Sequence, residues 1–100
     1  MHYLLMYDLA PDYLERRAAF RDAHLTLAWE AQRRGELVLA GALADPCDRA
    51  VLVFSCDTPE PVQLFAARDP YVTHGLVRAF HVRQWNTVVG EAAFAPVHPG

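Results

Sequence analysis

The chain contains no lysine, one serine and two cysteines among its 100 residues. Without lysine, Schiff-base and lysine-nucleophile mechanisms are excluded. The single serine, Ser55, lies inside an apolar run rather than on the sharp turn that carries a hydrolase nucleophile. The sequence therefore argues against the common nucleophilic enzymes that use either residue.

Cysteine and histidine spacing gives little sign of a disulfide or a metal centre. If residues 50–56 form a strand, the sulfurs of Cys47 and Cys56 lie about 20 Å or more apart, too far for a disulfide. Neither cysteine has metal-ligand spacing. His2 and His81 could approach each other on neighbouring strands, which is a weak metal motif. We expect two reduced thiols and no metal.

Charge and hydropathy limit the partners. The net charge is −3, and the nine arginines form no run of like charge, so nucleic acid and acidic membrane surfaces are poor candidates. No apolar stretch is long enough to span a membrane, and the N-terminus lacks the basic region and apolar core of a signal peptide. A cytoplasmic location is the default expectation.

The pattern of apolar residues predicts four strands and two helical regions. Apolar runs bounded by Pro, Gly or Asp predict strands over 2–9, 37–43 and 50–56, and an alternating pattern predicts a fourth strand over 76–85. Gly41 interrupts the second run, where a missing side chain allows a bulge or the close approach of a ligand. A short helix should follow Asp57 or Thr58 as its cap and end near Arg68.

Residues 12–34 are helix-forming throughout, but one helix of that length would extend about 34 Å against about 23 Å for the strands. We therefore predict a short helical piece over 12–18, a bend near Phe20 and a main helix from Asp22 to Arg34. Gly35 suits the position just beyond the last helical turn.

The order strand, helix, strand, strand, helix, strand predicts an α+β fold, a ferredoxin-like βαββαβ sandwich with one antiparallel four-stranded sheet. The strands over 2–9 and 50–56 are apolar on both faces, and the helices can cover only one face. We expect a homodimer formed through the open sheet face, because soluble monomers seldom expose so large an apolar patch. The chain reads as a single domain over 1–100, with a core over 1–85 and a C-terminal extension over 86–100.

His24 and Asp69 are the candidate catalytic pair. If the main helix begins near Asp22, His24 lies in its first turn, where the helix dipole favours the neutral ring. Asp69 follows the second helix at the same end of the sheet and could orient the imidazole and stabilise its cation. Two simpler interpretations stay open: Asp69 followed by Pro70 could only cap a helical turn, and His24 could only pack.

Other residues could complete a ligand site. Tyr71 could donate a phenolic hydrogen bond to a ligand or simply pack. Arg17 and Arg21 would suit a carboxylate or phenolate, although solvated arginines on a helix flank are common.

The order and spacing of three short motifs resemble the YciI-like (YCII-related) family over roughly residues 1–85. The motifs are Arg21-x-x-His24-Leu25, then Leu39-Ala40-Gly41-Ala42-Leu43, then Asp69-Pro70-Tyr71 with Gly75-Leu76 shortly after. The resemblance implies a ferredoxin-like fold, a dimeric α+β barrel and an active-site His–Asp pair on His24 and Asp69. Gly41-Ala42 departs from the Gly-Pro that is usual in that family.

Two functions from different classes follow. The first is a cofactor-independent enzyme that acts on a small cyclic or phenolic metabolite. It would be either a dehydrochlorinase-like lyase or an isomerase. His24 and Asp69 would supply general acid–base chemistry, and Arg21, Tyr71 and Gly41 would bind substrate. The second is a non-catalytic module that holds a small molecule in the same pocket, or supports a partner as a dimer. A cofactor-free oxygenase is a third possibility that the sequence does not separate from the first.

Overall fold

Four antiparallel strands form one sheet in the order β2-β3-β1-β4 in the computed structural model, which describes residues 1–100. The strands are β1 (His2–Leu9), β2 (Leu37–Ala42), β3 (Arg49–Ser55) and β4 (Val77–Trp85). All four predicted strands are confirmed, and β1 has the predicted bounds. The two strands that are apolar on both faces, β1 and β3, are the central ones, as expected.

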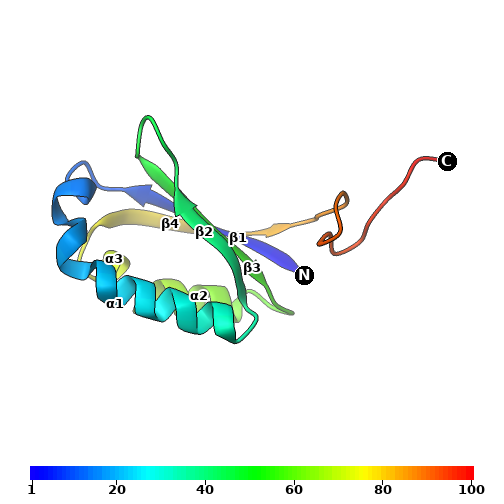
Figure 1. Cartoon of the computed structure of the whole chain (residues 1–100), viewed down its shortest axis with the longest axis horizontal. Coiled ribbons are helices and arrows are strands. Elements are labelled where there is room, and N and C mark those ends of the chain that lie inside the picture. Colours follow the sequence, from blue (N-terminus) through cyan, green and yellow to red (C-terminus); the bar gives the residue numbers. More distant parts are fainter.

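Three helices lie together on one side of this sheet (Figure 1). They are α1 (Tyr13–Arg33), α2 (Glu60–Arg68) and the single turn α3 (Pro70–Thr73). The arrangement confirms the predicted ferredoxin-like α+β fold, with α3 added between α2 and β4. None of the helices combines the length and the apolarity needed to cross a membrane.

The core fills the space between the sheet and the helices. Alternate residues of β1, namely Tyr3, Leu5, Tyr7 and Leu9, are buried on the helix-facing side. Their partners from α2 are Val62, Phe65 and Ala66, which are also buried, as the i, i+3, i+4 spacing predicts.

Helix α1 contributes far less to this core than its length suggests. Only Tyr13, Ala28 and Ala31 are buried among its 21 residues, whereas Leu25 and Trp29 are 37% and 57% exposed. A helix whose apolar side chains remain this exposed does not pack tightly on the sheet. The space left between α1 and the sheet is the cavity described below.

The predicted interruption of α1 near Phe20 is wrong. The helix is continuous from Tyr13 to Arg33, although its first turns, drawn blue, run at an angle to the rest in Figure 1. Those turns extend past the sheet because α3 supports them: the Phe20 ring stacks on His74 at 4.4 Å, and Arg16 donates to the His74 carbonyl. Gly35 ends the helix as predicted, with φ of +80°.

The structure also decides one predicted helix cap and two possibilities that the sequence left open. The N-cap of α2 is Pro59, without a side-chain hydrogen bond, rather than Asp57 or Thr58. The register shift in β2 lies between Leu37 and Leu39, whereas Gly41 pairs regularly with Val51. His2 lies opposite Trp85, and His81 lies opposite Met6. The two histidines are thus separated along the strands and form no metal pair.

The face of the sheet opposite the helices is apolar at its centre. Leu4 pairs with Val53 and Met6 with Val51, and all four side chains alternate with the buried residues of the core. Beyond Trp85 the chain forms no further helix or strand and extends away from the sheet (Figure 1). Cys47 and Cys56 are free thiols, as expected.

Candidate active site

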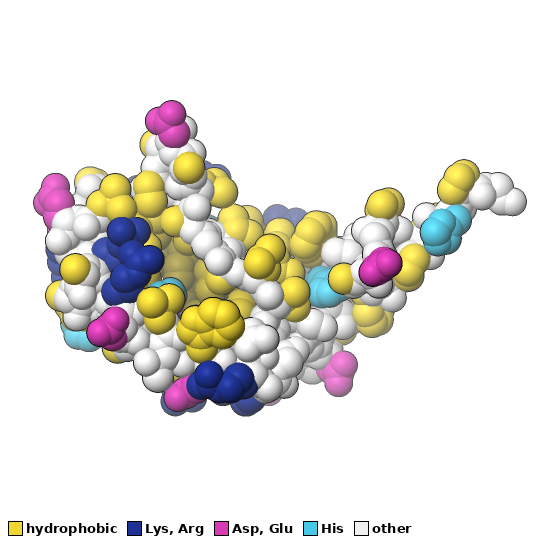
Figure 2. Space-filling model, in the orientation of Figure 1, with side chains coloured by type: hydrophobic (Ala, Val, Ile, Leu, Met, Phe, Trp, Pro, Cys, Tyr) yellow, Lys and Arg dark blue, Asp and Glu magenta, His cyan; other side chains and the backbone are white.

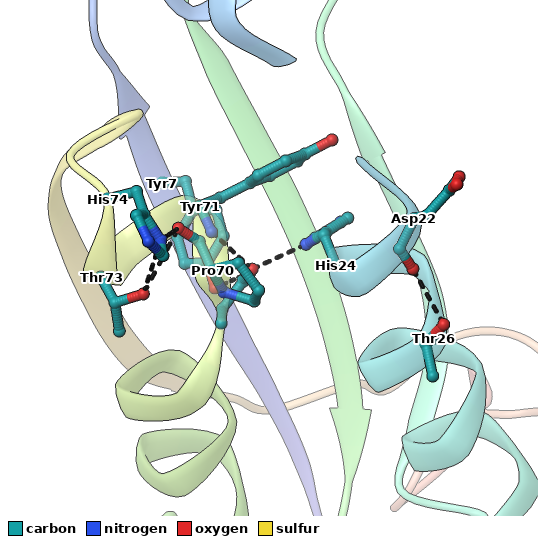
Figure 3. Close-up of polar contacts among 9 residues, drawn as sticks. Tyr7, Asp22, His24, Thr26, Pro70, Tyr71, Thr73 and His74 are labelled. Atoms are coloured by element: carbon teal, nitrogen blue, oxygen red, sulfur yellow. Dashed lines mark hydrogen bonds and ion pairs between the residues drawn. The ribbon is translucent and has the colours of Figure 1, made fainter. Parts of the chain in front are cut away.

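Asp69 is the centre of the polar site. It is completely buried and is the N-cap of α3, where its Oδ1 accepts a hydrogen bond of 3.0 Å from the backbone N–H of Tyr71. The same carboxyl group accepts a 2.7 Å bond from the Tyr7 hydroxyl at Oδ2 and a 2.8 Å bond from His24 Nδ1 at Oδ1 (Figure 3). Asp69 therefore does more than cap a turn.

The partners of Asp69 determine how His24 can act. A carboxylate only accepts hydrogen bonds, so the assignment that satisfies all three bonds places the proton of a neutral His24 ring on Nδ1. Nε2 then remains free to accept a proton. The His24 side chain is 15% exposed and lines the cavity, which gives the ring access to a ligand.

The prediction that His24 lies in the first turn of its helix is wrong. Because α1 begins at Tyr13, His24 lies about three turns into the helix rather than in its first turn. The field of the helix end falls off within the first turn. The bond to Asp69, rather than the helix dipole, controls which nitrogen of His24 carries the proton.

Tyr71 lies against one face of the His24 imidazole, whereas Asp69 binds its edge. Its ring stacks on His24 with a centroid distance of 3.9 Å and an interplanar angle of 9°. Figure 3 shows the Tyr71 side chain directed away from Pro70, and the residue lines the cavity. Burial raises the pKa of Tyr71 to about 12, while Arg21 and Arg17 act in the opposite direction. Tyr71 thus both packs and presents a protonated phenol to the cavity.

Tyr7 is a site residue that the sequence analysis missed. Burial raises the pKa of its hydroxyl well above the ordinary value, and the charge of Asp69 and the hydrogen bond to it add to the effect. The alternation of β1 shows that Tyr7 points toward the helices. No local pattern shows that it meets a carboxylate 62 residues away.

A cavity of about 520 Å³ opens beside this pair, between α1 and strands β2 and β3. Fourteen of its nineteen lining residues are hydrophobic, so the ligand that it fits is largely apolar. Figure 2 shows the hollow lined by hydrophobic side chains, with arginine side chains gathered on one side. The arginines that line the cavity are Arg17 and Arg21, and no ion pair in the structure uses either of them.

The five residues proposed from the sequence all line this cavity or contact a residue that does. His24, Tyr71, Arg21 and Gly41 line it, and Asp69 lies directly behind His24. A Cβ at Gly41 would meet no atom within 4 Å, so this position leaves room on the wall without being required by packing. No group of three or more His, Cys, Asp or Glu side chains is arranged to hold a metal ion.

The fold and site define a ferredoxin-like α+β domain with a His–Asp pair beside an apolar cavity. The YCII-related domain family matches residues 1–86, and the chain belongs to this family, which confirms the resemblance found in the sequence. No curated protein matches the chain.

The solved structures that are similar to the chain include two bacterial proteins. One is 5-chloro-2-hydroxyhydroquinone dehydrochlorinase from Burkholderia phenoliruptrix AC1100 in complex with 2,5-dihydroxybenzoquinone, with a TM-score of 0.73 and 21% identity over 87% of this chain and 95% of that one. The other is protein Atu4242 from Agrobacterium tumefaciens, with a TM-score of 0.57 and 14% identity over 94% of this chain and 98% of that one. At these identities the similarity establishes the fold.

Proposed function

We propose that the protein is a cofactor-independent enzyme of the lyase or isomerase type that acts on a small cyclic or phenolic metabolite. The observation that carries the proposal is the 2.8 Å bond between His24 Nδ1 and the completely buried Asp69, at the wall of an apolar cavity. A pair of this kind is suited to general acid–base catalysis.

In this proposal each member of the pair has a role. His24 Nε2 takes a proton from an acidic O–H or C–H of the substrate. In a lyase the electron pair left behind expels a leaving group, and the proton is later released to solvent. In an isomerase the electron pair shifts a double bond, and the imidazolium returns the proton to the substrate at a new position. Asp69 stabilises the imidazolium that forms, and its other two hydrogen bonds hold it in place. Arg21 and Tyr71 line the same cavity and would stabilise the resulting anion.

The similar dehydrochlorinase suggests a first substrate. That enzyme acts on 5-chloro-2-hydroxyhydroquinone, a phenolic ring with chloride as a leaving group. In the present protein the corresponding reaction would remove one substrate proton through His24 and release chloride with the electron pair of the C–Cl bond. No oxidant or reductant is needed, because the elimination of HCl is balanced by itself.

Chloride release from 5-chloro-2-hydroxyhydroquinone tests the proposal in the wild type, His24→Gln and His24→Ala. Both variants should lose about 10²- to 10⁴-fold in turnover, the usual contribution of general acid–base catalysis. His24→Ala also removes the hydrogen bond to the buried Asp69 and the stack on Tyr71, so the free energy of unfolding should fall by about 1–3 kcal/mol, and Tm should confirm that the variant is folded. Turnover by His24→Ala at the wild-type rate would overturn the proposal, and a large loss of Tm would favour a packing role.

The non-catalytic alternative predicts a different result. A thermal-shift screen of cyclic acids and phenols would then give a ligand that binds tightly without turnover and is unaffected by His24→Ala. The apolar, preformed cavity is compatible with such a module, and the buried Asp69–His24 bond favours the enzyme.

We also propose that two copies associate through the open sheet face. Leu4, Met6, Val51 and Val53 form an apolar centre there, and no helix of the same chain covers it (Figure 1). Face-to-face packing of two sheets would bury these residues at the usual spacing of about 10 Å.

A further inference from the structure

The cavity is larger than a single ring requires. Its volume is about 520 Å³, whereas a dry cavity of about 150 Å³ is enough to hold benzene. A ligand of one ring would therefore fill about a third of the space. The remaining volume is lined by apolar side chains, which gain little from contact with water.

The polar and apolar lining residues are also separated along the length of the cavity. Arg17, Arg21 and His24 come from the first twelve residues of α1. Trp29 and Leu37 lie at the other end, near the turn into β2. From His24 to the last lining residue of α1, Gln32, the helix rises about 12 Å, so the apolar end lies well beyond the ring that would contact His24.

The apolar end has few polar groups to satisfy a polar ligand. Trp29 is 57% exposed and Val38 51% exposed, and both line the cavity. When a ligand covers large apolar side chains at the edge of a cavity, apolar surface is removed from water, and this makes the free energy of binding more favourable. The only polar side chain at this end is Gln32.

From these observations we infer that the ligand is an amphipathic anion: a ring whose negative charge faces Arg17 and Arg21, with an apolar substituent that extends along α1 toward Trp29 and Leu37. The inference rests on the proposed function for the position of the ring, and it adds the size and polarity of the substituent. A bare phenol or hydroxyquinone would bind at the polar end alone.

Binding of a 4-alkylbenzoate series tests the inference without requiring turnover. Benzoate, 4-ethylbenzoate, 4-butylbenzoate and 4-hexylbenzoate carry a permanent negative charge at neutral pH and differ only in the apolar chain. Isothermal titration calorimetry should show affinity increasing by up to about fourfold for each methylene that is fully buried, with at least a tenfold gain from benzoate to 4-butylbenzoate. The neutral analogue 4-butylbenzamide should bind at least tenfold more weakly than 4-butylbenzoate.

Two variants separate the two ends of the cavity. Trp29→Ala should abolish most of the gain with chain length while leaving benzoate affinity unchanged. Arg21→Gln should weaken all four benzoates by a similar factor and preserve the gain. Leu64→Ala is the control, because Leu64 is an exposed leucine of α2 that does not line the cavity. This variant should change neither the affinity for benzoate nor the gain in affinity with alkyl chain length. Both Trp29 and Arg21 are exposed, so Tm should confirm that the variants fold.

Equal affinity across the series, absence of binding by every member, or a gain that survives Trp29→Ala would each overturn the inference. A gain that survives Trp29→Ala would mean that the alkyl chains of the benzoates bind elsewhere, for example on the open sheet face. These outcomes are distinct from failure of the proposed function. His24→Gln tested in the same titrations should keep the gain with chain length even if the wild type turns over no substrate.

Discussion

Tyr71 lies flat against His24, with the two ring centroids 3.9 Å apart and the planes 9° from parallel. Asp69 holds the edge of the same imidazole through Nδ1. The ring is therefore fixed in both its plane and its rotation before any ligand arrives. Preorganisation of this kind lowers the cost of reaching a productive geometry.

Substitution of Tyr71 should separate the stack from the hydroxyl. Tyr71→Phe keeps the ring, its contact with His24 and its edge contact with Tyr13 at 5.6 Å, so the free energy of unfolding should change by less than about 1 kcal/mol. Tyr71→Leu loses both aromatic contacts and should cost about 1–3 kcal/mol. Urea unfolding measures both values. Equal losses in the two variants would show that the stack contributes nothing.

Asp69→Asn keeps the shape of the buried side chain but replaces one acceptor oxygen with a donor. The groups around it, Tyr7 Oη, Tyr71 N–H and His24 Nδ1–H, all donate to the carboxylate. In the variant the Tyr7 hydroxyl would have to accept from the amide instead of donating, and His24 would lose the negative charge beside Nδ1. We expect a loss of about 1–3 kcal/mol in unfolding free energy and of about 10²- to 10⁴-fold in turnover. Asp57→Asn, at an exposed acid outside the site, is the control and should be nearly neutral. An Asp69→Asn variant that matches wild type in stability and turnover would remove Asp69 from the mechanism.

Tyr7→Phe tests the buried bond that the sequence did not reveal. The variant leaves Oδ2 of Asp69 without its partner in a site closed to water, which should cost about 1–3 kcal/mol at neutral pH. Equilibrium unfolding in urea at pH 7 measures the difference. A stability equal to that of the wild type would mean that another group satisfies Asp69.

The same variant should change how stability depends on alkaline pH. The pKa of Tyr7 is raised in the folded protein, so above about pH 10 the unfolded chain loses a proton that the folded protein keeps. The unfolding free energy of the wild type therefore falls as the pH rises through 10, and Tyr7→Phe should reduce that slope by up to about 1.4 kcal/mol per pH unit, the limit reached once the unfolded tyrosine is fully ionised. Urea unfolding at several pH values between 9 and 11 measures the two slopes. Equal slopes for the wild type and Tyr7→Phe would contradict the raised pKa of Tyr7 in the folded protein.

The open sheet face should control the oligomeric state. Val53→Arg places a charge at the apolar centre of that face, opposite Leu4, and should convert a dimer to a monomer because a buried unpaired charge is strongly unfavourable. Leu14→Arg, at a leucine of α1 that is 55% exposed, is the control and should remain dimeric. Light scattering after size-exclusion chromatography gives the mass. A monomeric wild type would show that the face is uncovered.

The sequence predicted the strands well because their signals are local. The run from His2 to Leu9 ends at Ala10-Pro11, and these bounds are the observed ones. The continuity of α1 was not predictable from length, because its first turns depend on contacts with His74, which lies more than fifty residues away. A comparison of helix and strand lengths cannot include support from an element that is itself only one turn long.

In the candidate site, too, some features could be predicted from the sequence and others could not. His24 and Asp69 could be paired from topology, because the helices carrying them meet at one end of the sheet. Tyr7 could be placed on the buried side of its strand, but its hydrogen-bond partner depends on where a side chain lies in three dimensions. A pocket beside the pair was predicted, but its extent along α1 was not. Leu25 and Trp29 have the spacing of ordinary core residues, and only their exposure shows that α1 stands away from the sheet.

Most of the apolar wall of the cavity comes from one uninterrupted stretch, Leu25 to Ala42, in which α1 turns at Gly35 directly into β2. The carboxyl group that orients the imidazole comes from the other half of the chain, and its hydrogen-bond partners, Tyr7, His24 and Tyr71, lie outside that stretch. Selectivity and reactivity can thus diverge independently during evolution. Exchanging this hairpin-like stretch between homologues would be expected to transplant substrate preference while retaining the proton-transfer apparatus.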